Sequence, residues 1–535
     1  MKKEIKNLIK NSLSILFKKK IFPKFQVPEI QIEYKKEKIY GDYSTNIALK
    51  IGKIINKNPI EVAQKISSDL KMQIPRIFEK IEIAEPGFIN FFISKECLQK
   101  GIKKVLKEKN NFGKLNLGRG KKVQVEFISA NPTGPLHIGN GRGAFFGDTL
   151  SNILEKAGYK VIREYYINDA KVNTQIKILG KTALGRGVTY LTPDLKLKIK
   201  RLEPKLKKIS DEGKAGHLLA QMIHKDIKNF IEKELKIKFD NWVSEEDLYK
   251  TSKVSKIYNW LKNKKLIYKR EGAEWLKISQ FGAPKDEVVV RKNGQPTYFL
   301  SDIAYHKDKF SRNFKKIINI WGADHQGHVP KIKAIAKILN YKGDLDILIT
   351  QLVRLKRGKI SKRKGRFITL KWLIDEVGLD AARFFYLVKS LDTQIEFDVE
   401  LAKEKSEKSP VYYIQYAHAR ICSILRKIPN SKFQIPNKFQ ATNLKLLKHP
   451  LELNLIKELI RLPEVIEDTV KDYQVQRIPQ YAMELATAFH QFYRDCKVLT
   501  ADKNLREARI ALVLATKIVL QNTLSLMGIS APKRM

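Results

Sequence analysis

A glycine-rich stretch with one histidine stands where this chain could most easily bind phosphate. Residues 129–148 read SANPTGPLHIGNGRGAFFGD and follow the alternating apolar run KKVQVEFI. This order predicts a strand, a glycine-rich turn and a helix, and the first N–H groups of such a helix attract anions. Gly139 and Gly141 would let a ligand approach the backbone closely, and His137 adds a donor beside them. The pattern predicts a site where charge develops on a phosphate during in-line displacement.

Two better-known nucleotide patterns fit the same stretch less well. A Walker A loop needs a lysine after its second glycine to bind the triphosphate. Asn140 follows Gly139 here, so the stretch is not a Walker A loop. The dinucleotide pattern GxGxxG/A is met by Gly139, Gly141 and Ala144, with Glu164 as the ribose-binding acid. A dinucleotide-dependent oxidoreductase therefore stays open as an alternative, although it gives His137 no role.

A second basic motif lies far downstream, in RLKRGKISKRKGRFITL. Lys359 and Lys362 flank Ser361 in a segment bounded by Gly358 and Gly365. Two ammonium groups in such a loop suit a leaving pyrophosphate, whereas hydride transfer has no use for them. The competing interpretation is a solvated basic turn in a lysine-rich protein.

The fold that must bring these motifs together is α/β. The runs VQVEFI, KVIREYYI, KIINIWG and DILITQLV alternate with helical patterns, which predicts a Rossmann-like parallel sheet in a catalytic domain spanning residues 114–390. A charged, helical stretch at about 171–281 is expected to be an insertion. Residues 1–113 predict an N-terminal α+β domain, in which IEIAEPGFINFFIS forms paired strands, and residues 391–535 predict a C-terminal α-helical bundle.

HIGN and KISKR resemble the HIGH and KMSKS motifs of class I aminoacyl-tRNA synthetases, with Asn140 and Arg363 as departures that leave the key cations in place. The segments EYYINDA, TYFLSDIAYH, INIWGADHQGH, DAARFF and SPVYYIQYAHAR extend the resemblance over essentially the whole chain, to the arginyl-tRNA synthetase family. The resemblance implies that ATP, accompanied by Mg²⁺, converts L-arginine to arginyl-adenylate and pyrophosphate. The arginyl group then passes to the 3′-terminal ribose of the tRNA for arginine. It also implies that bound tRNA is needed for the first step.

An arginine substrate requires a carboxylate for its planar, permanently charged guanidinium. Tyr298 and Asp302 lie one helical turn apart, so the ring can line the aliphatic stem while the acid binds the charge. Glu126 stands in an apolar strand, where a carboxylate needs a paired cation, and a guanidinium would supply one. The resemblance implies that Glu126 contacts the guanidinium, that Asn131 contacts the amino-acid end, and that His325 lies near the same pocket. Taken singly, Tyr298 and Asp302 are also compatible with a core tyrosine and a solvated acid.

The sequence offers no enzyme nucleophile, so catalysis is expected from positioning and charge stabilisation, with His137, Lys359 and Lys362 as the catalytic residues. His328 belongs to WGADHQGH, which is expected to shape the adenosine site, although a structural turn explains that motif nearly as well. The expected ATP-binding residues are His137, Gly139, Asn140, Gly141, His328, Lys359, Ser361 and Lys362.

The flanking domains are expected to bind tRNA, the first near its outer corner and the last at its anticodon. Aromatic rings stack on unpaired bases and arginines bind phosphate, but strand and core packing are the competing explanations for the same residues. The expected tRNA-binding residues are Asn90, Phe92, Tyr412, Tyr413, Tyr416 and Arg420.

Composition sets the remaining expectations. A formal net charge of +47 favours a polyanionic partner, unless it reflects lysine bias throughout the chain. Cys97, Cys422 and Cys496 are isolated, so neither disulfides nor a cysteine-based metal site is expected. No stretch is expected to span a membrane, and we expect a cytoplasmic monomer. A class I synthetase for another amino acid and a non-catalytic RNA-binding protein also stay open as alternatives.

Overall fold

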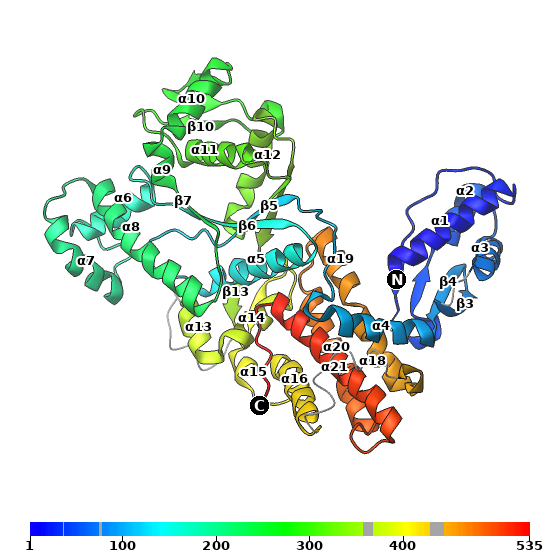
Figure 1. Ribbon diagram of the computed structural model, residues 1–535. Helices are drawn as coiled ribbons and strands as arrows, with labels where there is room; N and C mark the ends of the chain where they lie inside the picture. The colour runs from blue at the N-terminus through cyan, green and yellow to red at the C-terminus, as the bar shows by residue number, and fades with distance from the viewer. Residues whose placement is uncertain (36, 74–76, 357–367, 429–442) are drawn as a thin grey trace.

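Three folded parts make up the protein, arranged with the N-terminal domain apart from the catalytic domain and the helical bundle beneath both (Figure 1). The computed structural model describes residues 1–35, 37–73, 77–356, 368–428 and 443–535.

The catalytic domain is built on one parallel sheet in the order β12-β11-β5-β6-β7. The chain lays down β5, β6 and β7 in one direction and then returns to the other side of β5 for β11 and β12. The strand order therefore reverses between β5 and β11, and ligands of such sheets bind outside the carboxyl ends of the strands at this point. The strands are β5 (Lys122–Glu126), β6 (Lys160–Ile167), β7 (Asn241–Ser244), β11 (Lys316–Gly322) and β12 (Asp344–Thr350), and α5 (Ile138–Lys156) follows β5.

The stretch predicted as one insertion at about 171–281 is divided by a strand of the main sheet. β7 pairs with β6, so the helices before it form one unit and the segment after it forms another. The prediction missed β7 because this short edge strand is only half-buried and lacks an apolar run. The first unit holds α6 (Thr174–Ala183), α7 (Pro193–Leu206), α8 (Glu212–Asn229) and the π-helical η3 (Phe230–Glu234). The second holds α9 (Glu245–Lys250), α10 (Lys253–Asn263), η4 (Ser279–Phe281) and the sheet of β8 (Ile267–Arg270), β9 (Ala273–Leu276) and β10 (Glu287–Val290).

The rest of the catalytic domain covers the sheet and leads into the bundle. A small parallel pair, β13 with β14, extends this domain past the predicted boundary at residue 390. The elements are α11 (Tyr298–Ser311), η5 (Ala323–His328), α12 (Val329–Ile338), β13 (Val353–Leu355), α13 (Leu370–Val377), α14 (Leu379–Leu387), β14 (Ile395–Phe397) and α15 (Val399–Lys403).

The N-terminal domain has the predicted α+β character. Its antiparallel sheet runs β1-β2-β4-β3, and β3 and β4 are the two strands expected around Pro86. Its last helix, α4, packs on α18 and α21 of the bundle. The elements are α1 (Lys2–Lys18), β1 (Glu33–Tyr34), η1 (Lys38–Tyr40), β2 (Tyr43–Thr45), α2 (Ile47–Ile55), α3 (Pro59–Gln73), β3 (Phe78–Ala84), β4 (Phe88–Ile93), α4 (Lys95–Glu108) and η2 (Lys109–Asn111).

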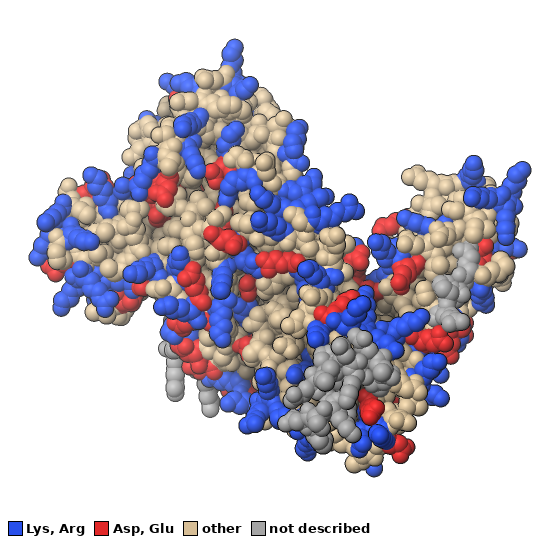
Figure 2. All heavy atoms as spheres, in the orientation of Figure 1, with Lys and Arg blue, Asp and Glu red and all other residues tan. Residues whose placement is uncertain are grey.

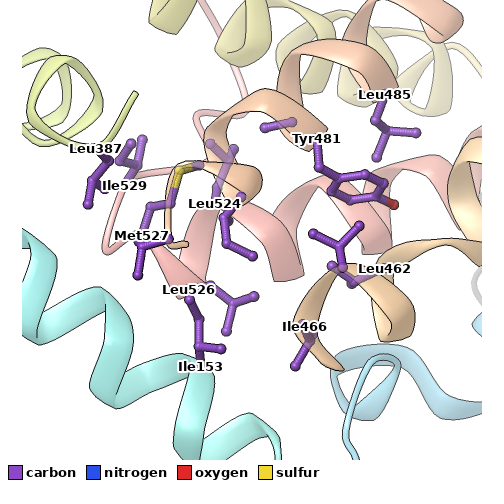
Figure 3. Close-up of a cluster of buried hydrophobic side chains, with 14 of the residues drawn as sticks. Ile153, Leu387, Leu462, Ile466, Tyr481, Leu485, Leu524, Leu526, Met527 and Ile529 are labelled. Atoms are coloured by element: carbon purple, nitrogen blue, oxygen red, sulfur yellow. The ribbon is translucent and has the colours of Figure 1, made fainter. Parts of the chain in front are cut away.

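The C-terminal bundle is joined to the catalytic domain through an apolar core. Figure 3 shows Ile153 of α5 and Leu387 of α14 beside Leu526, Met527 and Ile529 at the end of the chain. Among the described residues, α21 is long and apolar enough to cross a membrane, but 67% of its apolar window is buried, as expected for the central helix of a bundle. The elements are α16 (Pro410–Arg426), η6 (Leu444–Leu446), α18 (Pro450–Ile460), α19 (Leu462–Asp472), α20 (Arg477–Asp495) and α21 (Lys503–Leu526).

Candidate active site

His137 caps the helix that follows β5. Its Nδ1 accepts a hydrogen bond from the Gly139 N–H at 3.0 Å, and Asn140 Oδ1 accepts one from the His137 N–H at 2.9 Å. Partial burial lowers the pKa of His137, against the opposing charge of Asp324. The imidazole is therefore neutral at pH 7, and because Nδ1 is the acceptor the ring proton lies on Nε2. This N–H and the helix N-terminus can together donate to a phosphate.

Packing between helices explains why position 141 is a glycine. Gly141 is buried in α5, and a Cβ there would lie 2.8 Å from the Tyr386 ring and 2.9 Å from Leu370. Gly141 therefore allows α5 to approach α13 and α14, and an ATP contact at Gly141 stays a prediction.

The described residues that follow the second basic motif lie against the start of α5. The Ile138 N–H donates to the Ile368 carbonyl at 3.0 Å, and the Leu370 N–H donates to the Leu136 carbonyl at 2.8 Å. Lys359, Ser361 and Lys362 lie outside the described residues. The residues directly after that segment are nevertheless hydrogen-bonded beside His137.

Tyr298 and Asp302 both lie at the start of α11, as their spacing predicted. Tyr298 is 52% exposed, and Asp302 is half-buried beneath it. Burial raises the pKa of Asp302 well above its ordinary value, and the charges of Glu245 and Glu126 raise it further, while Lys309 acts in the opposite direction. The ionised form of Asp302 therefore lacks a sufficient cation in the protein itself.

The cation that Glu126 requires is supplied by the chain, not only by a substrate. Glu126 is 4% exposed and accepts from Lys309 Nζ and, at 3.0 Å, from Ser129 Oγ. Lys309 therefore already provides the cation that the sequence analysis expected near Glu126, and a substrate contact to Glu126 stays a prediction.

Glu245 is a buried acid near Asp302 that the sequence analysis did not single out. It is 2% exposed and accepts from Ser301 Oγ at 2.6 Å and Asn173 Nδ2 at 3.0 Å. Burial raises the pKa of Glu245, and its charge raises that of Asp302. It directly follows β7, at the carboxyl edge of the sheet, so recognition of β7 as a strand would have revealed it. The charges that act on Asp302 are thus two carboxylates, Glu245 and Glu126, against one ammonium, that of Lys309.

The WGADHQGH motif forms η5 at the end of β11. The Tyr298 hydroxyl lies 3.3 Å from His328 Nε2, and the rings of His325 and His328 are 5.8 Å apart. Burial lowers the pKa of His328, and the charge of Lys331 lowers it further. η5 therefore contacts the start of α11 through Tyr298, and the charge of its Asp324 acts on His137 at the start of α5.

The other predicted binding residues are spread over the molecule. Asn131 is exposed in the loop between β5 and α5. Asn90 is 3% exposed in β4, which counts against a contact with tRNA, whereas the half-buried Phe92 ring lies 4.1 Å from Lys80 Nζ.

A half-buried aromatic group lies on α16. The rings of Tyr412 and Tyr416 are nearly parallel with centroids 6.2 Å apart, and the Arg420 guanidinium lies 5.1 Å from the Tyr416 ring. Tyr413 packs against His490 at 4.5 Å. Lys and Arg side chains are scattered over the visible face, between uncharged areas and some acidic groups, and form no single patch there (Figure 2).

Glu164 cannot serve as the ribose acid of a dinucleotide site. It is fully buried and accepts from both Arg312 amino groups at 2.5 and 2.8 Å, from Tyr305 at 2.8 Å and from Gln124 at 2.5 Å. Burial raises the pKa of Glu164, but Arg312 and Lys309 outweigh this effect and hold the pKa below its ordinary value. The glycines of the supposed fingerprint also lie inside α5 and not in a turn after β5.

Known family models match all three domains of the chain. The model for the class I (R) tRNA synthetase catalytic domain matches residues 101–182 and 197–417. The arginyl-tRNA synthetase N-terminal domain matches residues 3–93, and the DALR anticodon-binding domain matches residues 414–535.

Individual relatives agree with these matches. The arginine–tRNA ligase of Acetivibrio thermocellus is 41% identical over 100% of this chain and 99% of its own. That of Caldanaerobacter subterraneus is 42% identical with the same coverage. The crystal structure of a putative arginyl-tRNA synthetase from Campylobacter jejuni superposes with a TM-score of 0.72 at 34% identity, covering 83% of this chain and 100% of that one. The Thermus thermophilus arginyl-tRNA synthetase gives a TM-score of 0.79 at 22% identity over both full chains.

The match to the class I catalytic domain over most of the chain, together with the parallel sheet and the capped helix after β5, identifies a class I aminoacyl-tRNA synthetase. The reaction of such an enzyme is the ligation of an amino acid to tRNA. The chain belongs to the arginyl-tRNA synthetase family, and its activity is arginine–tRNA ligation.

Proposed function

We propose that the acidic pocket between β5, α9 and α11 binds L-arginine while the start of α5 binds ATP. The observation that carries this proposal is the excess of carboxylate over cation among Glu126, Asp302, Glu245 and Lys309. A buried carboxylate that lacks a cation is unstable in its ionised form, and an entering guanidinium provides that cation.

Each pocket residue then has a distinct role. Asp302 and Glu245 bind the guanidinium, and the Tyr298 ring covers the aliphatic stem of the substrate. Asn131 binds the amino-acid end from the exposed loop before α5, and His325 borders the pocket from η5. Glu126, held by Lys309, completes the acidic surface.

The nucleotide half uses the N-terminus of α5. His137 Nε2, the Gly139 N–H and the Asn140 side chain bind phosphate, and His328 borders the adenosine. Lys359, Ser361 and Lys362 bind the leaving pyrophosphate. Because the arginine carboxylate attacks the α-phosphate directly, no covalent enzyme intermediate is required. The arginyl group then passes from arginyl-adenylate to the 3′-terminal hydroxyl of the tRNA, and AMP leaves.

Mg²⁺ fits this scheme only as a companion of ATP. In the part of the chain that the structure describes, no group of three or more His, Cys, Asp or Glu side chains is arranged to hold a metal. The ion would neutralise triphosphate charge when the nucleotide is bound, and the protein residues would orient the substrates.

The outer domains bind tRNA in this proposal. Phe92 belongs to the N-terminal contact, and Tyr412, Tyr413, Tyr416 and Arg420 belong to the anticodon contact. Asn90 could join only if its strand face became accessible. We further infer a cytoplasmic monomer.

Citrulline tests the arginine half, because it has the shape of arginine without the charge. ATP–pyrophosphate exchange in the presence of tRNA should favour arginine over citrulline by at least about 100-fold, because a neutral group leaves the buried acids unpaired. Comparable exchange with both substrates would mean that the acidic pocket does not bind the guanidinium.

A further inference from the structure

Lys309 is a buried ammonium without an assigned part in the reaction. It lies in α11 with 0% exposure, below the start of the helix that carries Tyr298 and Asp302. Burial of an ammonium costs several kcal/mol unless charged and polar partners surround it. An apolar side chain could fill the same space without this cost, so the partners of Lys309 indicate what its charge does.

The partners connect three elements at the point where the strand order reverses. Lys309 Nζ donates to Glu126 of β5 and, at 2.9 Å, to Asn319 Oδ1 of β11, and it lies 4.3 Å from the Tyr305 ring. Glu126 and Asn319 are directly paired in the parallel register. Lys309 thus connects α11 to the end of β5 and to the middle of β11.

The hydrogen bonds continue from Asn319 back to the substrate-facing turn. Asn319 Nδ2 lies 3.1 Å from His306 Nε2, and His306 Nδ1 lies 2.8 Å from the Asp302 carbonyl oxygen. Burial and the charge of Lys309 lower the pKa of His306 to about 3, so this ring is neutral at physiological pH. A neutral ring with its proton on Nδ1 donates to the Asp302 carbonyl and accepts from Asn319, which gives the whole chain of bonds one consistent direction.

We propose that Lys309 is a positioning residue for arginine binding, which holds the Glu126 carboxylate directly and the Asp302 turn through Asn319 and His306. The proposal rests on the roles proposed above for Glu126 and Asp302. Because both acids belong to one pocket, loss of the ammonium should displace the arginine site and leave the nucleotide site at the start of α5 unchanged. A purely structural lysine would instead affect both sites or neither.

The test compares KM for arginine and KM for ATP in the full-length enzyme with tRNA present. Lys309→Met should raise KM for arginine by about 10- to 100-fold, since small displacements of binding groups have effects of this size, while KM for ATP stays within about twofold. Lys307→Met is the matched control, because Lys307 is an exposed residue of the same helix, and both constants should stay unchanged. A parallel rise of both KM values in Lys309→Met, or no rise, would overturn the proposal.

A double-mutant cycle with Glu126→Gln shows whether Lys309 acts through that carboxylate. If it does, Glu126→Gln should raise KM for arginine in the wild-type background and add less than about threefold in the Lys309→Met background. Full multiplication of the two effects would refute the coupling. If Glu126→Gln alone has no effect, the proposed arginine contact of Glu126 is refuted, and so is the claim that Lys309 acts through Glu126.

Asn319→Ala provides the second variant in case Lys309→Met does not fold. It keeps the Lys309–Glu126 pair and breaks the connection to His306. KM for arginine should rise at least about threefold with KM for ATP unchanged. An unchanged KM for arginine in a folded Asn319→Ala enzyme would refute the connection between Lys309 and the Asp302 turn.

Discussion

Replacement of Asp302 by asparagine should separate substrate binding from stability. The substitution keeps the shape of the side chain and removes its charge from a pocket that already contains Glu245 and Glu126. Loss of one partner of a buried ion pair costs about 3–5 kcal/mol, and about 1.4 kcal/mol corresponds to a factor of ten. We therefore expect kcat/KM for arginine to fall about 10²- to 4 × 10³-fold, with KM for ATP unchanged.

The stability of the free enzyme should change in the opposite direction, so that Asp302→Asn is more stable than the wild type at neutral pH. Because the pKa of Asp302 is raised by burial, the native state binds its proton more tightly than the unfolded state does. The wild type therefore loses stability as pH rises from the ordinary aspartate value, about 3.9, through the raised native value. Asp302→Asn removes this loss. The free energy of unfolding of the variant, relative to that of the wild type, should therefore grow by up to about 1.4 kcal/mol per pH unit within that window.

Steady-state kinetics and denaturant unfolding at pH 5 and pH 8 measure both effects. Asp308→Asn, on the same helix but outside the pocket, should change kcat/KM for arginine less than about twofold. The reasoning is refuted if Asp302→Asn leaves kcat/KM for arginine within threefold of the wild type, or if the variant is less stable than the wild type at pH 8.

Three further substitutions test other parts of the molecule. Lys362→Ala should lower the maximal rate of pyrophosphate exchange about 100-fold with little change in KM for arginine, and a rise in that KM alone would contradict a role at the leaving group. Glu164→Gln should destabilise the protein by about 2–3 kcal/mol in urea unfolding, because it removes the buried charge that binds both Arg312 amino groups and leaves Arg312 only its ion pair with Asp308, and unchanged stability would contradict a structural role. Gly141→Ala should cost about 1–3 kcal/mol in the same assay because its Cβ meets Tyr386, and a stable but inactive variant would restore a ligand contact at this position.

Strong local patterns predicted most of the fold. The apolar runs of β5, β6, β11 and β12 identified four of the five strands of the main sheet, and these predictions are confirmed. β7 was missed because an edge strand with half-buried side chains carries no apolar run. That omission also misplaced the insertion as a single unit.

The site was predictable only where its residues are close in sequence. Tyr298 and Asp302 were paired correctly because one turn of helix sets their relation. The partner of Glu126 was not predictable, since Lys309 comes from a distant helix and only the tertiary fold brings its ammonium to the strand. Glu245 was hidden for the same reason, because its position at the pocket depends on β7.

Charging of total tRNA with each of the twenty amino acids, by the purified full-length protein with ATP, tests the central claim most directly. We predict that arginine alone becomes attached to tRNA, and that Asp302→Asn abolishes most of this charging while leaving ATP binding intact. Charging with a different amino acid, or equal charging by the wild type and Asp302→Asn, would contradict an acidic pocket that selects the guanidinium.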